Sequence, residues 1–340
     1  MSLQSRIDAL LESFGPPPPP PRGIPFPQLY PIVMDWRFPL SVAVAYILSI
    51  LALNPKSSAV SRVVAKSKGL NTAYTSKQSG KRMTAFVFVH NAFLFLYSGI
   101  TFYNSFGALS KRHRTAESWT EAFCDHGKVC WNEAFGYWAY LFYLSKYYEI
   151  VDTIIILAKG RRSSFLQSYH HAGAIITMWI ATKYATPAVW IFVLFNSFIH
   201  TIMYFYYALT SVGFSPPGKQ YLTTAQILQF AVGSTISFLY FVIPGCMSAG
   251  QRFSAVVTLL YIGPLLYLFF DFALRTYGKG KRFSKADAKT AVNGKVMSNG
   301  MSNGMSNGKS NGMSNGKSNG MSNGMTNRRS IFNANRMFSW

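Results

Sequence analysis

Charged residues are scarce in this chain. They make up 13% of its 340 residues, against roughly 25% in an average soluble protein. Acidic residues are the scarcest, with 11 Asp and Glu beside 33 Lys and Arg. A soluble nucleic-acid binder would carry such an excess of positive charge on one face of a polar domain. Here the basic residues lie in loops and in the tail, between long apolar stretches, so we expect a membrane protein without a nucleic-acid partner.

Cysteine and histidine are also few, with three and six residues. Cys124 and Cys130 are not spaced like zinc ligands, and no histidine lies beside Cys246, so the sequence predicts no metal site. Membrane di-metal desaturases and hydroxylases use many histidines in lipid-embedded helices. Two of the six histidines here, His113 and His126, lie outside the apolar stretches, which argues against that class.

The apolar stretches indicate how the chain crosses the membrane. Seven of them approach the ~20 residues that span a bilayer. Lysine and arginine gather after the first and third stretches and at the start of the tail, and the positive-inside rule makes these segments cytosolic. We therefore predict an all-α, multi-pass membrane protein with a lumenal N-terminus and a cytosolic C-terminus. Its seven transmembrane helices are expected at 36–53, 83–104, 134–158, 165–182, 187–208, 223–243 and 254–275.

The segments at the two ends have biased compositions. Residues 1–35 form a Pro-rich segment, in which the run from Pro16 to Pro21 interrupts any signal-peptide apolar region. Residues 281–340 contain repeats of Met-Ser-Asn-Gly and Lys-Ser-Asn-Gly, a composition that cannot bury a core. We expect an extended N-terminal spacer, a seven-span domain over 36–280, and a disordered, basic, cytosolic tail.

The three cysteines are expected on one side of the membrane. Cys124 and Cys130 lie in the second loop and Cys246 in the sixth, all on the non-cytosolic side of the predicted topology. Disulfides persist in the oxidising lumen of the endoplasmic reticulum. The sequence therefore predicts one bridge from Cys246 to Cys124 or Cys130, with three free thiols as the alternative.

Four polar clusters at helical spacing lie within the apolar stretches. Residues three, four and seven apart share one face of a helix, so each cluster turns its polar groups to one side. Ionisable residues within hydrocarbon usually face a protected interior, so we expect four helices to converge on one polar site in the cytosolic half of the membrane. The clusters are Lys146-x-x-Glu149-x-x-Asp152-Thr153, Gln167-x-x-His170-His171, His200-x-x-Met203-Tyr204-x-x-Tyr207 and Thr223-x-x-Gln226-x-x-Gln229.

In this order the clusters resemble the motifs of the ELO family of very-long-chain fatty acid elongases. The resemblance covers about residues 36–280 and implies an intramembrane acyl tunnel in the endoplasmic reticulum membrane. It implies condensation of an acyl-CoA with malonyl-CoA to a 3-ketoacyl-CoA, with release of carbon dioxide and CoA. No cofactor is then expected beyond these two substrates, and the expected partners are membrane lipid and the other enzymes of the elongation cycle.

One position departs from the family pattern. The family motif is usually His-x-x-His-His, and this chain has Gln167 in the first place. This variant resembles the polyunsaturated-fatty-acid elongases of fungi, algae and other lower eukaryotes. The resemblance therefore implies a polyunsaturated long-chain acyl-CoA as substrate, and Gln167 itself cannot serve as nucleophile or metal ligand.

The expected chemistry gives roles to individual side chains. A neutral imidazole can accept an acyl group and divide one difficult step into two, and the resemblance supports His170 as this nucleophile. His200 is the expected base or second acyl contact, while His171 would orient His170 or the thioester carbonyl. Amide groups can stabilise an enolate oxygen in the manner of an oxyanion hole, and the candidates are Gln167, Gln226, Gln229 and Asn196.

Charged and aromatic residues around the clusters are expected to bind substrate. Lys146, Glu149 and Asp152 should form one paired network, because an unpaired charge at that depth is neutralised or expelled. Basic groups at the membrane surface can hold CoA phosphates. The remaining candidates for substrate binding are Lys159, Arg161, Arg162, Tyr204 and Tyr207.

Each interpretation has a simpler rival. Paired histidines can hydrogen-bond between transmembrane helices, as His90 and Asn91 are expected to do, and basic loops can serve topology alone. Tyr204 and Tyr207 have the spacing of ordinary packing. At the level of function, the alternatives are the di-metal desaturase or hydroxylase and a seven-span receptor or transporter, although carriers more often show broken helices at the midplane.

Overall fold

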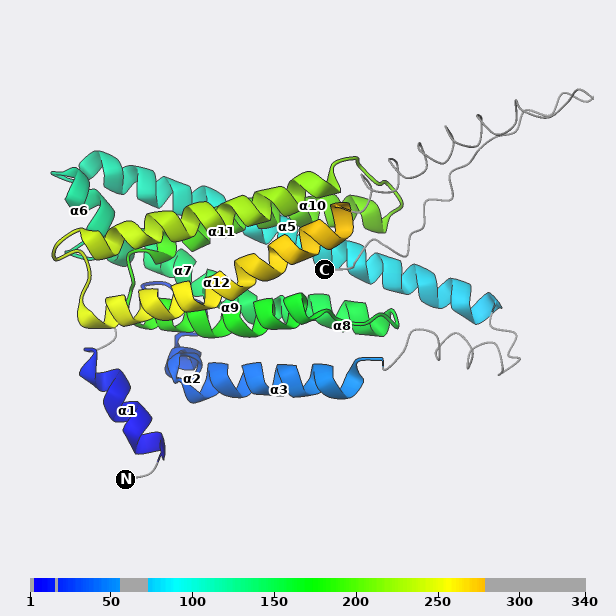
Figure 1. Cartoon of the computed structure of the whole chain (residues 1–340), viewed down its shortest axis with the longest axis horizontal. Coiled ribbons are helices and arrows are strands. Elements are labelled where there is room, and N and C mark those ends of the chain that lie inside the picture. Colours follow the sequence, from blue (N-terminus) through cyan, green and yellow to red (C-terminus); the bar gives the residue numbers. More distant parts are fainter. Residues whose placement is uncertain (1–2, 16–17, 56–72, 279–340) are drawn as a thin grey trace, which may run out of the picture. The chain divides into compact units, whose positions relative to one another are not determined.

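The computed structural model describes residues 3–15, 18–55 and 73–278, with side chains from residue 80 onward in the last stretch. Within these ranges the chain forms helices and turns without a β-strand, which confirms the all-α prediction. The helices labelled in Figure 1 are α1 (Leu3–Ser13), α2 (Tyr30–Met34), α3 (Arg37–Leu53), α5 (Ala73–Thr115), α6 (Trp119–Cys124), α7 (Gly136–Tyr148), α8 (Ile150–Ala158), α9 (Phe165–Lys183), α10 (Val189–Ser211), α11 (Lys219–Val242) and α12 (Ala249–Tyr277).

The chain divides into two compact units, and residues up to Ala273 belong to the first, which is described here. Two predicted features fall elsewhere. The basic first loop lies largely within 56–72, and the tail predicted to be disordered lies within 279–340. Both ranges are outside the described residues.

Among the described residues, four helices are long and apolar enough to cross a membrane, namely the Gly80–Thr115 part of α5, α10, α11 and α12. The bent pair Pro27–Met34 and Arg37–Leu53, at 69°, makes a fifth if it forms one span. The chain is therefore a multi-pass membrane protein. The stretch expected to be a third span is a π-helical turn at Trp131–Phe135, then α7 and α8, which are interrupted at Glu149.

Packing within the first unit centres on α9 and α10. The helix α10 lies against α5 and α11, and α9 lies against α3 and α7, as Figure 1 lets the reader follow. The indole of Trp179 donates to Met34 O at 2.8 Å, and the hydroxyl of Tyr143 donates to Val33 O at 2.7 Å. These bonds fix α2 on α9 and α7. The hydroxyl of Tyr184 likewise donates to Leu11 O of α1 at 2.8 Å.

The turn between α8 and α9 sets the register of the predicted site. Gly160 has φ of 66°, a left-handed conformation that glycine adopts at little cost, and it reverses the chain. Ser164 then caps α9, since its hydroxyl accepts from the N–H of Gln167 at 3.1 Å. Asn54 at the end of α3 exchanges two hydrogen bonds with the backbone of Ser163, at 2.8 and 3.0 Å. These contacts place Gln167 of α9 opposite Thr153 of α8.

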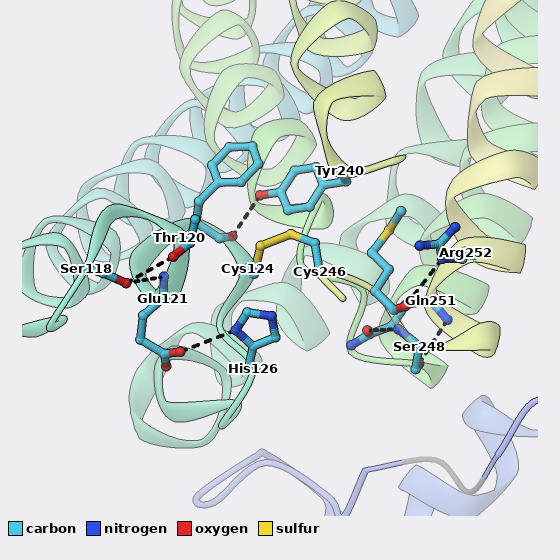
Figure 2. The surroundings of a disulfide bond; sticks show 12 residues. Ser118, Thr120, Glu121, Cys124, His126, Tyr240, Cys246, Ser248, Gln251 and Arg252 are labelled. Atoms are coloured by element: carbon cyan, nitrogen blue, oxygen red, sulfur yellow. Dashed lines mark hydrogen bonds and ion pairs between the residues drawn. A yellow bond between two sulfur atoms is a disulfide. The ribbon is translucent and has the colours of Figure 1, made fainter. Parts of the chain in front are cut away.

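A disulfide joins the end of α6 to the turn between α11 and α12. It pairs Cys124 with Cys246 and leaves Cys130 as a buried thiol. Beside it the hydroxyl of Tyr240 donates to Phe123 O at 3.1 Å and accepts from the indole of Trp190 at 2.6 Å, as Figure 2 shows in part. Of the two pairings that the sequence left open, the structure contains the one with Cys124.

Candidate active site

The four sequence clusters contribute side chains to one cavity. This polar cavity has a volume of about 60 Å³ and receives residues from α5, α8, α9, α10, α11 and α12. Helices far apart in sequence therefore bring hydrogen-bonding and ionisable groups to one enclosed place. Its polar lining consists of Asn91, Asp152, Gln167, His170, His171, His200, Tyr204, Tyr207 and Gln226.

The imidazole of His171 is held from α8 and α9. Gln167 donates its amide N–H to His171 Nε2 at 2.8 Å and also lies 3.4 Å from the hydroxyl of Thr153. That hydroxyl shares a 2.8 Å hydrogen bond with Tyr46 of α3. Because Nε2 accepts, the proton of neutral His171 resides on Nδ1. Gln167 thus orients a histidine.

His170 is positioned by Tyr261 of α12, a residue that no sequence motif indicated. The hydroxyl of Tyr261 lies 2.9 Å from the carbonyl oxygen of His170 and 3.2 Å from its Nδ1. A hydroxyl has one hydrogen, and the carbonyl can only accept it. The hydroxyl oxygen then accepts from Nδ1–H, which leaves Nε2 of His170 with its lone pair.

Gly173 provides the space for this contact. A Cβ atom at Gly173 would stand 2.0 Å from Cε2 of Tyr261, so any other residue there displaces the phenol ring. The rings of Phe230 and Phe269 make T-shaped contacts with the imidazole of His170, with centroids at 6.5 and 6.4 Å. The imidazole of His170 therefore lies between an oriented phenol and an apolar wall.

The predicted charge network is divided into two groups. Lys146 donates to Glu149 Oε1 at 2.7 Å and to Asn196 Oδ1 at 3.0 Å, and His200 Nδ1 lies 3.7 Å from the same carboxylate oxygen. Lys146, Glu149 and His200 are all buried. Lys146 and Glu149 pair as expected, and the ammonium of Lys146 also donates to the amide oxygen of Asn196 on α10.

Asp152 makes no direct hydrogen bond to Lys146 within the described residues, although the two opposite charges attract each other. One of its carboxylate oxygens lies 2.8 Å from His90 Nε2, and the other accepts from Tyr204 OH at 2.7 Å. The partners come from α5 and α10, and they engage both oxygens of Asp152. His90 was predicted to make structural hydrogen bonds, and its bond to Asp152 makes it part of the wall behind the polar cavity.

The glutamines of α11 have unused hydrogen-bonding capacity. Gln226 lines the polar cavity and donates only to Met203 Sδ, at 3.3 Å. Within the described part of the chain, its Oε1 atom and that of Gln229 are buried without a hydrogen-bond partner. Gln229 itself is not among the residues lining the cavity. Of these two glutamines, Gln226 is thus the one that the structure brings to the polar cavity.

The predicted CoA-binding residues lie in the turn between α8 and α9, outside the polar cavity. Burial, together with the charge of Arg161, lowers the pKa of Lys159. Arg161 also interacts repulsively with Lys219 at the start of α11, a residue that the sequence interpretation missed. Arg162 is exposed. A concentration of positive charge therefore lies at this end of the helices.

Residues 31–285 match the GNS1/SUR4 family, ELO. The chain belongs to this family. The match contains every residue of the polar cavity and confirms the resemblance that the four clusters indicated. It also favours an ELO protein over the desaturase, receptor and transporter alternatives.

Several ELO relatives share part of their length with this chain. It is 32% identical over 211 residues to fatty acid elongase sre1 of Dictyostelium discoideum, covering 62% of this chain and 71% of that protein. It is 35% identical over 156 residues to fatty acid elongase A of the same organism, covering 43% of this chain and 56% of the relative. Fatty acid elongase 5 of Leishmania major is 36% identical over 161 residues, with coverage of 45% and 60%. In the last two, the match spans less than two thirds of the relative.

One group within this ELO site has the geometry of metal ligands. Glu149, His170 and His200 offer ligand atoms that lie within 4.8 Å of one another, a donor set like that of some zinc enzymes. The ammonium of Lys146 already donates to this carboxylate, so a metal cation here would be repelled by a charge of the same sign. The sequence predicted no metal here, and we interpret the group as a paired carboxylate beside two imidazoles.

Proposed function

We propose that this chain is a fatty acid elongase that condenses acyl-CoA with malonyl-CoA to a 3-ketoacyl-CoA, with release of carbon dioxide and CoA. The observation that carries this proposal is the position of His170. Its imidazole belongs both to the polar cavity and to a second, mainly apolar cavity of about 50 Å³. A thioester carbonyl can meet His170 from the polar side while its alkyl chain enters the apolar side. The names of the relatives support the same activity.

In the first step, Nε2 of His170 attacks the acyl-CoA carbonyl. The C–N bond forms, the C–S bond breaks, and the CoA thiolate leaves, so the enzyme holds an acyl-imidazole in its imidazolium form, with the hydrogen still on Nδ1. Tyr261 supports the step because it accepts from Nδ1–H and keeps the lone pair on Nε2.

In the second step, malonyl-CoA loses carbon dioxide, and the resulting enolate carbon attacks the acyl carbonyl. The new C–C bond forms, the C–N bond breaks, and His170 is regenerated. Gln226 can donate to the developing enolate oxygen, since its amide group is engaged only by a thioether. His200, beside Glu149, lines the same cavity and can act as base or position the malonyl group.

The membrane arrangement belongs to the same proposal. We place α7 with α8, and α9, across the bilayer with the bent pair and the four long helices, giving seven spans around an acyl tunnel. The polar residues of these helices face the cavity, which lowers their hydropathy without exposing charge to lipid. Lys159, Arg161 and Arg162 would hold CoA phosphates on the cytosolic side of the endoplasmic reticulum membrane.

Two finer assignments complete the proposal. The preferred substrate is a polyunsaturated long-chain acyl-CoA, which the Gln167 variant of the histidine motif supports. The product requires reduction and dehydration before another round, so the chain would work beside the reductases and dehydratase of an elongation cycle.

The test uses purified protein, a panel of acyl-CoAs and labelled malonyl-CoA, with detection of 3-ketoacyl-CoA by mass spectrometry. Intact protein should form product, and His170→Ala should form none. His113→Ala serves as the matched control, because His113 is exposed outside the cavity. Incubation with acyl-CoA alone should add the acyl mass to the intact protein and not to His170→Ala. If folded protein forms no product with any acyl-CoA, the proposed function is wrong.

A further inference from the structure

The lining of the polar cavity, as far as the described residues form it, contains one carboxylate and neither lysine nor arginine. The carboxylate is that of Asp152, whose side chain is 21% exposed, so it can act directly on a molecule in the cavity. The other polar groups of the lining are amides, phenols and imidazoles. Solvent screens a charge weakly in such an enclosed place. A bound anion would therefore meet a negative charge.

The hydrogen bonds of Asp152 hold its carboxylate without neutralising it. One oxygen lies 2.8 Å from His90 Nε2 and the other accepts from Tyr204 OH at 2.7 Å. The other ring nitrogen of His90, Nδ1, lies 3.3 Å from Tyr148 OH. A neutral imidazole satisfies both contacts, because Nδ1 can accept from the phenol while Nε2–H donates to Asp152. Both donors to the carboxylate are then uncharged.

The nearest ammonium group is committed elsewhere. Lys146 attracts Asp152, but its hydrogen bonds go to Glu149 and Asn196. It lines the apolar cavity, and the polar cavity does not include it. Lys146 and Glu149 together carry no net charge. The charge of Asp152 therefore remains uncompensated on the side that faces the polar cavity.

Tyr204 adds to this effect. Its hydroxyl has one hydrogen, which is directed to Asp152. Toward the cavity the hydroxyl can then offer only oxygen lone pairs. A carboxylate needs donors, so this part of the wall suits a neutral group better than an anion.

Malonyl-CoA brings a carboxylate to this cavity and must lose it as neutral carbon dioxide. A cation beside that carboxylate would stabilise the bound substrate and oppose the reaction, because only interactions that favour the transition state accelerate it. An anion has the opposite effect. It raises the energy of the bound carboxylate, and the repulsion falls as the charge moves to the thioester oxygen. The amide of Gln226, from α11, is available to that oxygen.

We propose that Asp152 is a catalytic residue of the second step and drives decarboxylation by repelling the malonyl carboxylate. This inference rests on the proposed elongase function and deepens it. The bond between the carboxylate carbon and the methylene carbon breaks, its electron pair forms the enolate, and carbon dioxide leaves without transfer of a proton. Contacts to the CoA portion offset the repulsion when malonyl-CoA binds. The acyl-imidazolium at His170 attracts the enolate, and its charge disappears when the new C–C bond forms.

The first test needs only binding. S-(2-carboxyethyl)-CoA and S-(2-carbamoylethyl)-CoA are thioethers that cannot acylate His170, and they differ in having a carboxylate or an amide at the end. Wild type should bind the amide about tenfold more tightly by calorimetry, whereas Asp152→Asn should lose this preference. Glu133→Gln is the matched control, because Glu133 is 51% exposed in an ion pair outside the cavity. It should keep the wild-type preference.

The second test isolates the step itself. Enzyme is first acylated with acyl-CoA and then mixed with malonyl-CoA labelled in its carboxylate, and released carbon dioxide is counted. Asp152→Asn should lower the maximal rate about tenfold and also lower the malonyl-CoA concentration that gives half of that rate. Loss of both together is the pattern of relieved ground-state strain. Asp152→Glu keeps the charge and should stay closer to wild type in both values.

The outcomes separate this inference from the proposed function. Wild type that binds the carboxylate thioether as tightly as the amide, or more tightly, overturns the inference, and this comparison stands even where Asp152→Asn does not fold. A slower Asp152→Asn enzyme with unchanged or weaker use of malonyl-CoA also overturns it, because a purely structural role gives that result. Absence of product from wild type with every acyl-CoA instead defeats the elongase proposal.

Discussion

At the scale of single residues, the arrangement of His170 depends on hydrogen-bond arithmetic. The hydroxyl of Tyr261 donates its one hydrogen to the backbone carbonyl of His170, and its oxygen accepts from Nδ1–H. The side chain that decides the tautomer comes from α12, 91 positions away in sequence. The ring of Tyr261 fits only because position 173 is glycine.

Tyr261→Phe should therefore lower the rate of enzyme acylation by about tenfold, the value of roughly one buried hydrogen bond. KM should change little, because the phenyl ring still fills the same space. Gly173→Ala should reproduce the loss by displacing the ring. Single-turnover acylation measured by intact mass gives the rate directly. Acylation of Tyr261→Phe at the wild-type rate would show that the phenol does not orient His170.

Lys146 and Glu149 illustrate the cost of separating a buried pair. Lys146→Met leaves a buried carboxylate without its main partner and should lower the free energy of unfolding by about 3–5 kcal/mol. Lys146→Met/Glu149→Gln should recover most of that loss, since no bare charge remains. Thermal and denaturant unfolding in detergent would measure both.

The control for that pair is the ion pair Lys111–Glu133, whose side chains are 61% and 51% exposed. Lys111→Met should change stability by no more than about 1 kcal/mol. Equal losses at the buried and exposed pairs would contradict the interpretation of Lys146 and Glu149.

At the scale of elements, a π-helical turn connects the second loop to α7. Asp125 accepts from the backbone N–H groups of Cys130 and Trp131 at 3.1 and 3.2 Å and so caps the turn. Gly136 is required where the turn joins α7, because a Cβ there would lie 2.6 Å from Trp131 O. The same turn buries the thiol of Cys130.

Burial, followed by the nearby Asp125 carboxylate, raises the pKa of Cys130 to about 12. A raised thiol pKa keeps the protonated form until the pH approaches that value, so about one molecule in ten thousand carries the reactive thiolate at pH 8. Iodoacetamide should therefore leave the native protein unlabelled from pH 7 to 9 and add one label after unfolding. Cys130→Ser should remove that label. Rapid alkylation of native protein would contradict the burial of this thiol.

At the scale of the whole molecule, the sequence predicted the convergence of polar residues correctly. The helical spacing of the four clusters decides which side each group faces, and members of all four meet near His170. The spacing of residues within one helix cannot predict which side chains of other helices they will hydrogen-bond to. Asp152 bonds to His90 and Tyr204 because α5 and α10 happen to present donors there, and Lys146 consequently turns to Glu149 and Asn196.

The internal break of one predicted span was also missed. A hydropathy pattern treats 134–158 as one apolar segment, but the structure interrupts it at Glu149, between α7 and α8. Tyr261 and Lys219 had no motif around them, so only packing could reveal the first beside His170 and the second beside Arg161. The disulfide needed a choice between Cys124 and Cys130 that depends on where α6 ends.

The separation of the two linked cysteines has a consequence for biosynthesis. Cys246 is synthesised 122 residues after Cys124, after α7, α9 and α10 have been synthesised. The apolar cluster around the disulfide contains both cysteines together with Ala188 and Ala255. Formation of the disulfide is therefore a late event in maturation, and a nascent chain that stops short of Cys246 also lacks Tyr261, the residue that positions His170.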